Sequence, residues 1–372
     1  MLTVNFLYLS EEDMIHAGVL DMHACIDSME YTFRLLRDGD YRLGGNNDSH
    51  GLRTRFPKKS EISGMPKDAP GRWFTAMPAY LGGKYGVFGF KTYGANQDNG
   101  RKNLPRSILM MQLLDVDTGM PLAYMSANIL SAMRTGAVSG LFARYFADPH
   151  AKKVAVIGPG VIGRYSLDAV MDVCSEIESI SIFGRGEKSR AVFKEHCIAH
   201  HYPMEHYQDC RSIREACADA DVVITATTQA SVYSEYPLIE AGCLKPGACV
   251  IVTSAVCIDR SYCNSRISTF AADIREMYAG NRGLDAAPSE SEAKVSVTVK
   301  NHLFEMLSSN ETVLNLPDVV SDGNYRRDPN VIAFCASGGI PVEDVAWGCE
   351  CYRNALKKGI GTSLKLWDES KL

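Results

Sequence analysis

The hydrophobic and polar positions of the first 150 residues predict a helix followed by several strands. Ser10 and Asp13 resemble a capping box, and apolar residues at helical spacing extend the predicted helix to about Asp38. Residues 41–71 are rich in Gly, Asn, Ser, Pro and Lys, which indicates a loop. Alternating runs then predict strands at 73–79, 86–93, 107–115 and 120–126, and a helix at 131–146.

From residue 152 the pattern changes to short apolar strands that alternate with amphipathic helices. The expected strands are 154–157, 179–183, 222–225, 248–252 and 269–271, and the expected helices are 162–173, 188–200, 210–218 and a short one at 237–240. This alternation predicts an α/β fold with a doubly wound parallel sheet of the Rossmann type. A last amphipathic helix is expected at 341–358.

The central position of this pattern predicts a discontinuous domain layout. We expect residues 131–319 to form a Rossmann dinucleotide-binding domain. Residues 1–130 and 320–372 then form a second, α+β domain into which the Rossmann domain is inserted.

Composition narrows the class of protein further. The 372 residues are enough for two domains, and a net charge of -5 without a basic run argues against nucleic-acid binding. The acidic N-terminal segment does not resemble a signal peptide, and the apolar runs are shorter than the roughly 20 residues that span a membrane. The 12 cysteines are therefore expected to be reduced thiols in a cytoplasmic protein without membrane contact.

A glycine-rich segment in the middle of the chain indicates the cofactor class. The expected strand 154–157 runs into Gly158-Pro159-Gly160-Val161-Ile162-Gly163, and a helix follows. In such a fingerprint the first glycine makes a tight turn, the second lets the backbone approach a pyrophosphate, and the third lets helix pack on strand. The N–H groups at the start of the helix, including those of Val161 and Ile162, favour phosphate binding.

The end of the second Rossmann strand discriminates between the two nicotinamide cofactors. An NAD site usually has an acidic residue there, whereas this chain has Gly184 and Arg185, with Ser189 and Arg190 nearby. A guanidinium beside a small residue suits a ribose 2′-phosphate, so NADP(H) is the preferred cofactor. NAD(H) is the alternative, because Glu187 offers a carboxylate.

Further motifs on both sides of the fingerprint carry a family resemblance. They are Met77-Pro78-Ala79-Tyr80, Leu104-Pro105-Arg106-Ser107, Leu130-Ser131-Ala132-Met133-Arg134-Thr135 and Gly338-Gly339-Ile340-Pro341. In order and spacing the chain resembles the ornithine cyclodeaminase/μ-crystallin family over roughly residues 70 to 365. The Met-Pro-Ala-Tyr and Leu-Pro-Arg-Ser forms of the motifs are closest to those of the amino-acid and opine-type dehydrogenases of the family. This branch includes the enzyme oxidising N-(2-amino-2-carboxyethyl)glutamate.

The resemblance implies NAD(P)-dependent hydride transfer at a carbon that bears nitrogen, in a homodimer built through the non-Rossmann domain. It implies that Arg72 and Arg134 hold the carboxylate of an amino or imino acid and that Lys91 assists proton transfer. Thr135 matches a residue on the cofactor phosphates, and the turn Thr225-Ala226-Thr227 is assigned to the cofactor site. These roles agree with the chemistry of the residue types, since arginine binds carboxylates bidentately and a desolvated lysine can exchange protons near neutrality.

Two alternatives remain open at this stage. Ornithine cyclodeaminases carry an aspartate in the turn after strand 222–225, but the turn here, from Thr225 to Ala230, has no carboxylate. This weakens the cyclodeaminase assignment without affecting hydride transfer. The second alternative is a non-catalytic NADPH-binding crystallin-like protein, against which the presence of Arg72, Lys91 and Arg134 together argues.

We expect no metal site. His196 and His200 are spaced as in zinc-binding helices, but they fall on a helix that normally faces solvent and lack the glutamate of an HExxH motif. Asp344 is interpreted as a charge at the start of the last helix.

Overall fold

The computed structural model describes residues 3–44, 51–69, 71–228, 235–280, 294–297 and 313–371. These residues divide into two compact units. Unit 1 comprises Met1–Asp21, Asp38–Arg134 and Ile340–Leu372, and unit 2 comprises Met22–Arg37 and Thr135–Gly339. The sequence placed residues 1–130 and 320–372 in one domain, whereas unit 2 includes most of helix α2 (Met22–Asp38) and the strand β18 (Ile332–Ala336).

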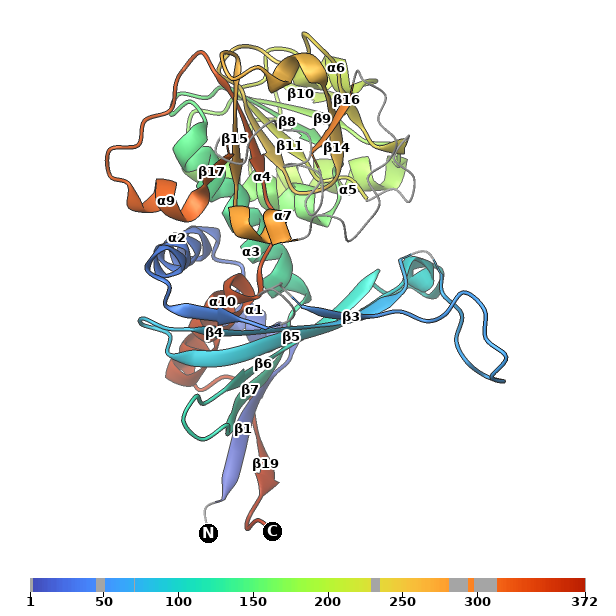
Figure 1. Cartoon of the computed structure of the whole chain (residues 1–372), viewed down its shortest axis with the longest axis vertical. Helices are drawn as coiled ribbons and strands as arrows, with labels where there is room; N and C mark the ends of the chain where they lie inside the picture. The colour runs from blue at the N-terminus through green and yellow to red at the C-terminus, as the bar shows by residue number, and fades with distance from the viewer. Residues whose placement is uncertain are drawn as a thin grey trace. The chain divides into compact units, whose positions relative to one another are not determined.

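Unit 1 is built on a mixed sheet, sheet A, with the strand order β19-β1-β7-β6-β5-β4-β2 and with β3 paired to β4 (Figure 1). Only the pair β1 and β7 is parallel, and the other pairs are antiparallel. The strands are β1 (Val4–Leu9), β2 (Tyr41–Leu43), β3 (Leu52–Thr54), β4 (Trp73–Leu81), β5 (Val87–Ala95), β6 (Ser107–Leu114), β7 (Pro121–Ser126) and β19 (Thr362–Trp367).

The predicted strands at 73–79, 86–93, 107–115 and 120–126 are thus confirmed as β4 to β7. The predicted loop at 41–71 also holds the short strands β2 and β3, and Ser49 and His50 lie outside the described residues. Gln97–Lys102 forms a 3₁₀ helix, η2, between β5 and β6.

The predicted N-terminal helix is two helices, α1 (Glu11–His16) and α2 (Met22–Asp38). The capping box is present, because Asp13 N–H donates to Ser10 Oγ and Ser10 N–H donates to the Asp13 carboxylate. The helix breaks because Gly18 has a φ of 97°, a left-handed conformation that helices do not contain. The apolar face of α2, with Ile26, Met29 and Phe33, is buried in unit 2.

Helix α10 (Pro341–Lys358) has the bounds that the sequence predicts and contacts β4, β5 and β6 of sheet A. Pro341 occupies the first helical turn, and Gly359 ends the helix with a φ of 64°. The face of α10 toward the sheet includes Trp347, whose indole N–H donates to the carbonyl of Val19. The first turn, which contains Glu343 and Asp344, is buried as well.

Unit 2 contains sheet B, with the order β10-β9-β8-β11-β13-β18-β15-β17 and parallel pairing throughout. The predicted Rossmann-type fold is confirmed. Its strands are β8 (Lys153–Ile157), β9 (Ser179–Phe183), β10 (Tyr207–Asp209), β11 (Val222–Thr225), β13 (Cys249–Val252), β15 (Ser268–Ala272), β17 (Val313–Asn315) and β18 (Ile332–Ala336).

The helices of unit 2 connect these parallel strands. They are α3 (Asn128–Phe146), which begins in unit 1, α4 (Val161–Val173), α5 (Glu187–Ala199), α6 (Ile213–Cys217), α7 (Arg275–Gly280) and α9 (Leu316–Ser321). The strands β12 (Leu238–Ile239), β14 (Val256–Asp259) and β16 (Lys294–Val297) form a small third sheet, and Arg260–Cys263 forms the 3₁₀ helix η4. The helix predicted at 237–240 is therefore wrong, because Leu238 and Ile239 pair with β14 instead.

No helix among the described residues is long and apolar enough to cross a membrane. All 12 cysteines are free thiols, and 11 of them are buried while Cys263 is partly exposed.

Candidate active site

The glycine fingerprint of unit 2 has the geometry that a bound dinucleotide requires. Gly158 follows β8 with a φ of 96°, and a Cβ there would lie 2.6 Å from the carbonyl carbon of Ala226. A Cβ on Gly163 would lie 2.5 Å from the carbonyl oxygen of Gly158. A Cβ on Gly160, by contrast, would have no described atom within 4 Å. Two of the glycines are therefore required by close packing, whereas the third borders space without described atoms, as the close approach of a pyrophosphate requires.

The start of α4 supplies donors to the same space. Gly160 is the N-cap of this helix and offers no side-chain cap, so the N–H groups of the first turn have no acceptor within the helix. Val161 is half-exposed at this end. Thr135 is on α3, next to a point of close contact with α4. At this point a Cβ on Gly136, the residue after Thr135, would lie 2.4 Å from the carbonyl oxygen of Tyr165 on α4.

The turn after β11 lies against the fingerprint. Ala226 N–H donates to the Ile157 carbonyl at 2.8 Å, and Thr227 N–H donates to Ser254 Oγ at 2.8 Å. The hydroxyl of Thr225 is buried and has no partner among the described residues, and the same is true of Ser337 after β18. The buried carboxylate of Asp273 accepts the N–H groups of Gly338 and Gly339 and so fixes that second turn. These orphaned hydroxyls and the open glycine fit a dinucleotide at this edge of sheet B.

The three residues after β9 that the sequence assigned to the ribose 2′-phosphate differ in whether their side chains already have partners. Arg190 is engaged, since Nε pairs with Asp209 at 2.9 Å and Nη1 donates to the carbonyl of Gly184 at 2.7 Å. Ser189 Oγ donates to the carbonyl of Gly186. Arg185 is exposed and has no ion-pair partner among the described residues. Of the three, Arg185 is the side chain available to a phosphate.

In unit 1, two cations and two carboxylates form a buried network beneath α10. Lys91 Nζ lies 2.7 Å from Asp344 Oδ2 and donates to Ser131 Oγ at 3.0 Å. Arg134 Nε donates to Asp344 Oδ1 at 3.1 Å, and its Nη1 donates to Glu343 Oε2 at 2.6 Å. The side chains of Lys91 and Arg134 are 3% and 8% exposed, and both carboxylates are 0% exposed. The charges balance, which makes the burial of four ionised groups tolerable.

The local sequence explains how Lys91 and Asp344 come to be in this network. Lys91 is in the middle of β5, where burial alternates, and it occupies the face that Val87 and Gly89 also occupy. Asp344 is three and four residues before Trp347 and Gly348, which are on the buried face of α10. The sequence interpretation of Asp344 as a helix-terminal charge missed this role, although the helical spacing contained the signal.

Burial makes Lys91 a group that can exchange protons near neutrality. Desolvation lowers the pKa of Lys91 to about 8, and the nearby Arg134 adds to this, although Asp344 opposes it. Desolvation also acts to lower the pKa of Arg134, but Asp344 and Glu343 outweigh it and raise that pKa above its ordinary value. Arg134 therefore stays charged while Lys91 titrates.

Arg72 is outside this network. It precedes β4, and its Nη1 donates to the carbonyl of Lys67 at 3.1 Å. Among the described residues it makes no hydrogen bond or ion pair with Lys91, Arg134 or their carboxylates.

Three other arginines gather around Trp73 at the start of β4. The guanidinium carbons of Arg53, Arg55 and Arg106 lie 4.9, 5.6 and 6.0 Å from the centre of the indole ring. None of them has an acidic partner among the described residues, and the buried indole N–H of Trp73 has no acceptor there. Sequence reasoning missed Arg53 and Arg55, because the polar composition of residues 41–71 indicated only a loop.

The register of sheet A places two members of this cluster, Trp73 and Arg53, on the same face as Lys91. Trp73 lies opposite Ala95, and Arg53 lies opposite Thr75, which in turn lies opposite Tyr93. Residues 91, 93 and 95 alternate onto one face of β5, so Arg53 is about 7 Å and Trp73 about 13 Å along the strand direction from Lys91.

These two units define an α/β protein in which a Rossmann-type unit accompanies a mixed-sheet unit with a buried lysine. The chain belongs to the ornithine cyclodeaminase/mu-crystallin family, whose model matches residues 18–359.

Named relatives are similar along most of their length. The N-((2S)-2-amino-2-carboxyethyl)-L-glutamate dehydrogenase of Staphylococcus aureus is 25% identical over 302 residues, which are 78% of this chain and 82% of that protein. The Thermococcus litoralis Delta(1)-pyrroline-2-carboxylate reductase, solved with NADH and L-proline, superposes with a TM-score of 0.76 at 24% identity, covering 96% and 100% of the two chains. An archaeal alanine dehydrogenase dimer with bound NAD superposes with a TM-score of 0.74 at 22% identity, covering 98% and 100%.

Proposed function

We propose that this protein is an NAD(P)-dependent oxidoreductase that acts on the C–N bond of an amino acid or its imine. The observation that carries the proposal is the buried Lys91, held by Asp344 and Ser131 with a pKa of about 8, in a chain that also has a dinucleotide fingerprint. The named relatives that act on amino and imino acids support it.

Lys91, the two residues that hold its Nζ, and Arg134 each have a definite part in this chemistry. A bound nicotinamide supplies or accepts the hydride. In the reductive direction protonated Lys91 donates a proton from Nζ to the imine nitrogen, and in the oxidative direction neutral Nζ removes a proton from the amine. Asp344 and Ser131 hold Nζ in place. Arg134 has N–H groups beyond those given to Glu343 and Asp344, and with these it can bind the substrate carboxylate. Arg72 remains a proposed second carboxylate ligand.

The direct test measures nicotinamide oxidation with 2-oxo acids plus amines and with cyclic imines such as pyrroline-2-carboxylate. The reverse reaction is measured with amino acids, including alanine and ornithine. Turnover supports the oxidoreductase, and release of ammonia from ornithine without net change of cofactor indicates a cyclodeaminase instead. Cofactor binding without any turnover indicates the non-catalytic crystallin-like alternative.

We propose NADP(H) as the preferred cofactor, with Arg185 binding the ribose 2′-phosphate. Replacing Arg185 with alanine removes a charge-assisted contact, so we expect the Kd for NADPH to rise by about 10- to 100-fold while the Kd for NADH stays close to unchanged. Fluorescence titration of both cofactors measures this. Lys188→Ala, which removes another exposed cation of the same segment, serves as the matched control. Equal weakening of both cofactors in Arg185→Ala would contradict the assignment.

The arginine cluster around Trp73 favours a substrate with more than one carboxylate. Among the described residues, the three arginines have no acidic partner and the indole N–H has no acceptor, so the cluster can bind an anion, and Arg53 and Trp73 are on the face that carries Lys91. A small monocarboxylate that reacts beside Lys91 does not extend to the level of Trp73, about 13 Å along the strand, whereas an opine-type substrate extends much of this way and passes the level of Arg53. The relative that acts on N-(2-amino-2-carboxyethyl)glutamate is consistent with this class.

We therefore expect Arg53→Gln to raise KM for an opine-type substrate by about tenfold or more and to leave KM for alanine or pyrroline-2-carboxylate nearly unchanged. Steady-state kinetics on both substrate types measures the difference. Arg42→Gln, at an exposed arginine of β2 that bonds to backbone carbonyls of its own segment, is the control. A uniform KM increase for all substrates would argue against a subsite for a second carboxylate.

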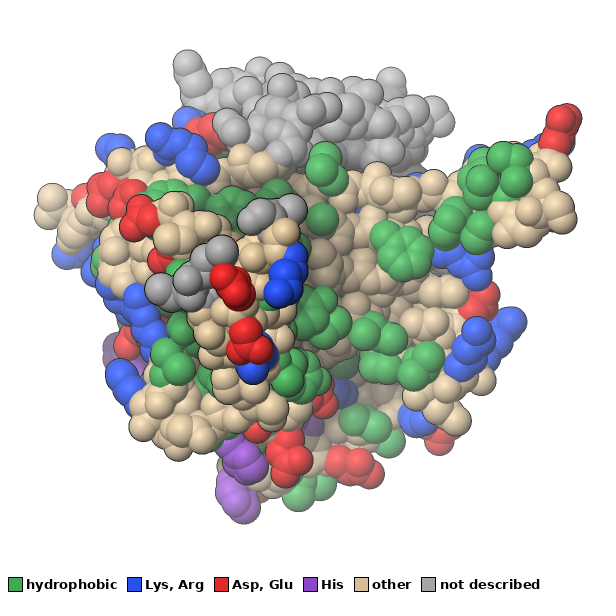
Figure 2. All heavy atoms as spheres, turned by 90° about the horizontal axis from the view of Figure 1, so that it is seen from below, with side chains coloured by type: hydrophobic (Ala, Val, Ile, Leu, Met, Phe, Trp, Pro, Cys, Tyr) green, Lys and Arg blue, Asp and Glu red, His purple; other side chains and the backbone are tan. Residues whose placement is uncertain are grey.

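We also propose a homodimer formed through unit 1. Phe74 and Ile108 are 53% and 48% exposed, and both lie opposite Gly94 in the register, so they form an apolar row on the outer face of sheet A. Figure 2 shows hydrophobic side chains gathered between charged ones on the face that it presents. Exposed apolar groups of this kind favour association with a second copy, and the molar mass in solution measures it.

A further inference from the structure

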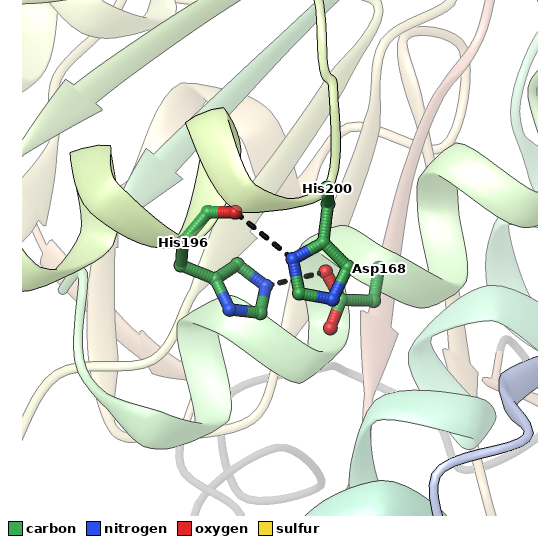
Figure 3. Close-up of side chains that lie close together, drawn as sticks. All are labelled: Asp168, His196 and His200. Carbon is green, nitrogen blue, oxygen red and sulfur yellow. Dashed lines mark hydrogen bonds and ion pairs between the residues drawn. The ribbon is translucent and has the colours of Figure 1, made fainter.

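Unit 2 holds a cluster of ligand-type side chains that the proposed reaction does not use. Asp168 on α4 and His196 and His200 on α5 each offer one ligand atom, and these atoms lie within 4.8 Å of one another. This is the one such group of three among the residues that the structure describes. Figure 3 shows both imidazole rings pointing toward the carboxylate from the neighbouring helix.

The structure removes one of the two reasons for which the sequence excluded a metal, namely the exposure of the helix face. The histidines of α5 were expected to face solvent, but the His196 side chain is only 14% exposed and that of Asp168 is 10% exposed. His196 Nε2 lies 2.7 Å from Asp168 Oδ1, so the α5 face that carries it packs against α4. His200 follows α5 as its C-cap residue and is exposed, which leaves one side of the cluster open to solvent.

The hydrogen bonds of His200 leave one ring nitrogen ready to bind a cation. Its Nδ1 lies 2.9 Å from the carbonyl oxygen of His196. A carbonyl only accepts, so Nδ1 carries the proton in this contact and the neutral ring has its lone pair on Nε2. Histidines that bind metals are oriented in this way, with the second nitrogen donating to a backbone carbonyl.

The Asp168 carboxylate is also oriented by a hydrogen bond from a residue outside the three proposed ligands. The hydroxyl of Tyr202 donates to Asp168 Oδ1 at 2.8 Å, and Tyr202 is close to both imidazoles, with ring centres 6.4 Å from His196 and 5.5 Å from His200. A hydrogen bond from outside the ligand set fixes the direction of a ligating carboxylate. Ligand atoms, a fixed tautomer and a supporting donor are thus present together.

We propose that Asp168, His196 and His200 form a zinc-binding site with water as the fourth ligand. Two imidazole nitrogens and one carboxylate suit Zn²⁺, whereas Mg²⁺ and Ca²⁺ prefer sites made entirely of oxygen. When zinc enters, His196 Nε2 gives up its proton to solvent and Nδ1 takes one up, so that the ring stays neutral, and Nε2 and the Asp168 oxygen separate to lie about 2.0–2.2 Å from the metal. The exposed His200 ring then moves so that its Nε2 becomes the third protein ligand of the zinc.

Such a site has a structural role in unit 2. It joins α4, whose first turn follows the fingerprint, to the end of α5, whose first turn follows Arg185 and Gly186. The cross-link is located in the second half of both helices, away from the glycines. We therefore expect zinc to stabilise the fold of unit 2 without taking part in hydride transfer.

The experiment titrates the chelator-treated, full-length protein with zinc chloride in competition with a colorimetric zinc indicator. One tight equivalent per chain is expected, with affinity about tenfold or more weaker in His200→Ala and in His196→Ala. His206→Ala, which removes an exposed histidine of the same unit, is expected to keep the wild-type affinity. His200→Ala changes an exposed side chain, so it tests the proposal even if His196→Ala fails to fold.

Thermal unfolding gives a second readout. Zinc at about 100 times its Kd is expected to raise the Tm of wild type and of His206→Ala by about 5–10 °C, and to leave the Tm of His200→Ala unchanged. Absence of a tight equivalent in wild type would overturn the proposal. So would equal zinc affinity in wild type and His200→Ala, which would assign the zinc to other thiols or histidines.

Discussion

Replacing Lys91 with methionine is expected to reduce kcat for amine oxidation or imine reduction by about 10²- to 10⁴-fold, the usual contribution of a positioned acid or base. Methionine fills a similar volume, so the sheet can still pack on α10, and Asp344 keeps its contact with Arg134. The dinucleotide fingerprint is in the other unit, so cofactor affinity should stay close to unchanged. Steady-state turnover and NADPH titration on the same preparation measure both quantities.

Lys84→Met is the matched control, because Lys84 belongs to the same unit but is 46% exposed and pairs with Glu350 at the surface. It should retain nearly all turnover. If Lys91→Met folds, binds cofactor and turns over at the wild-type rate, Lys91 is not the proton-transfer group and the proposed chemistry loses its central residue.

Replacing Asp344 with asparagine is expected to shift the pH profile of the reaction. The reductive reaction needs protonated Lys91, so kcat/KM in wild type should be constant below pH 8 and fall as the pH rises through about 8. The negative charge of Asp344 raises the pKa of Lys91, and its removal lowers that pKa. The fall in kcat/KM should therefore begin at lower pH in Asp344→Asn. In the oxidative direction, activity should rise with pH and reach its plateau earlier in the variant.

Asp344→Asn also leaves two buried cations with one carboxylate, which should lower the free energy of unfolding by about 3 kcal/mol at pH 7. Glu343→Gln is the control that separates stability from proton transfer, because Glu343 pairs with Arg134 and not with Lys91. It should destabilise the fold to a similar degree, but the fall in kcat/KM should move less than in Asp344→Asn, because Glu343 raises the pKa of Lys91 less than Asp344 does and makes no hydrogen bond with Nζ. Identical pH profiles in all three proteins would show that Asp344 has only a structural role.

Periodicity predicted the elements that have a strong local signal. The bounds of α10, the strands β4 to β7 and the strand–glycine–helix unit could all be read from spacing, because each pattern is complete within a short window. Short strands at sheet edges, such as β3 and β10, depend on a partner strand for their conformation. The helix expected at 237–240 failed for the same reason, since two residues pairing with β14 override weak local propensity.

The candidate site could be predicted only in part. The family resemblance pointed to Lys91 and Arg134, but not to the carboxylates that hold them. Lys91 and Asp344 are 253 residues apart in sequence, and no local pattern reports a contact over that distance. The arginines near Trp73 are likewise brought together by β3 pairing with β4, which the polar composition of residues 41–71 concealed.

The assembly of unit 1 from three separate segments has a consequence for biosynthesis. When the ribosome has made β5 and α3, the sheet face that carries Lys91 still lacks α10, whose translation begins 195 residues after the end of α3. Until Pro341–Lys358 leaves the exit tunnel, the nascent sheet has neither its apolar cover nor the acidic groups that neutralise Lys91 and Arg134. Folding of unit 1 is therefore complete only after α10 has been made, its contact order is high, and the incomplete sheet is exposed to aggregation until then.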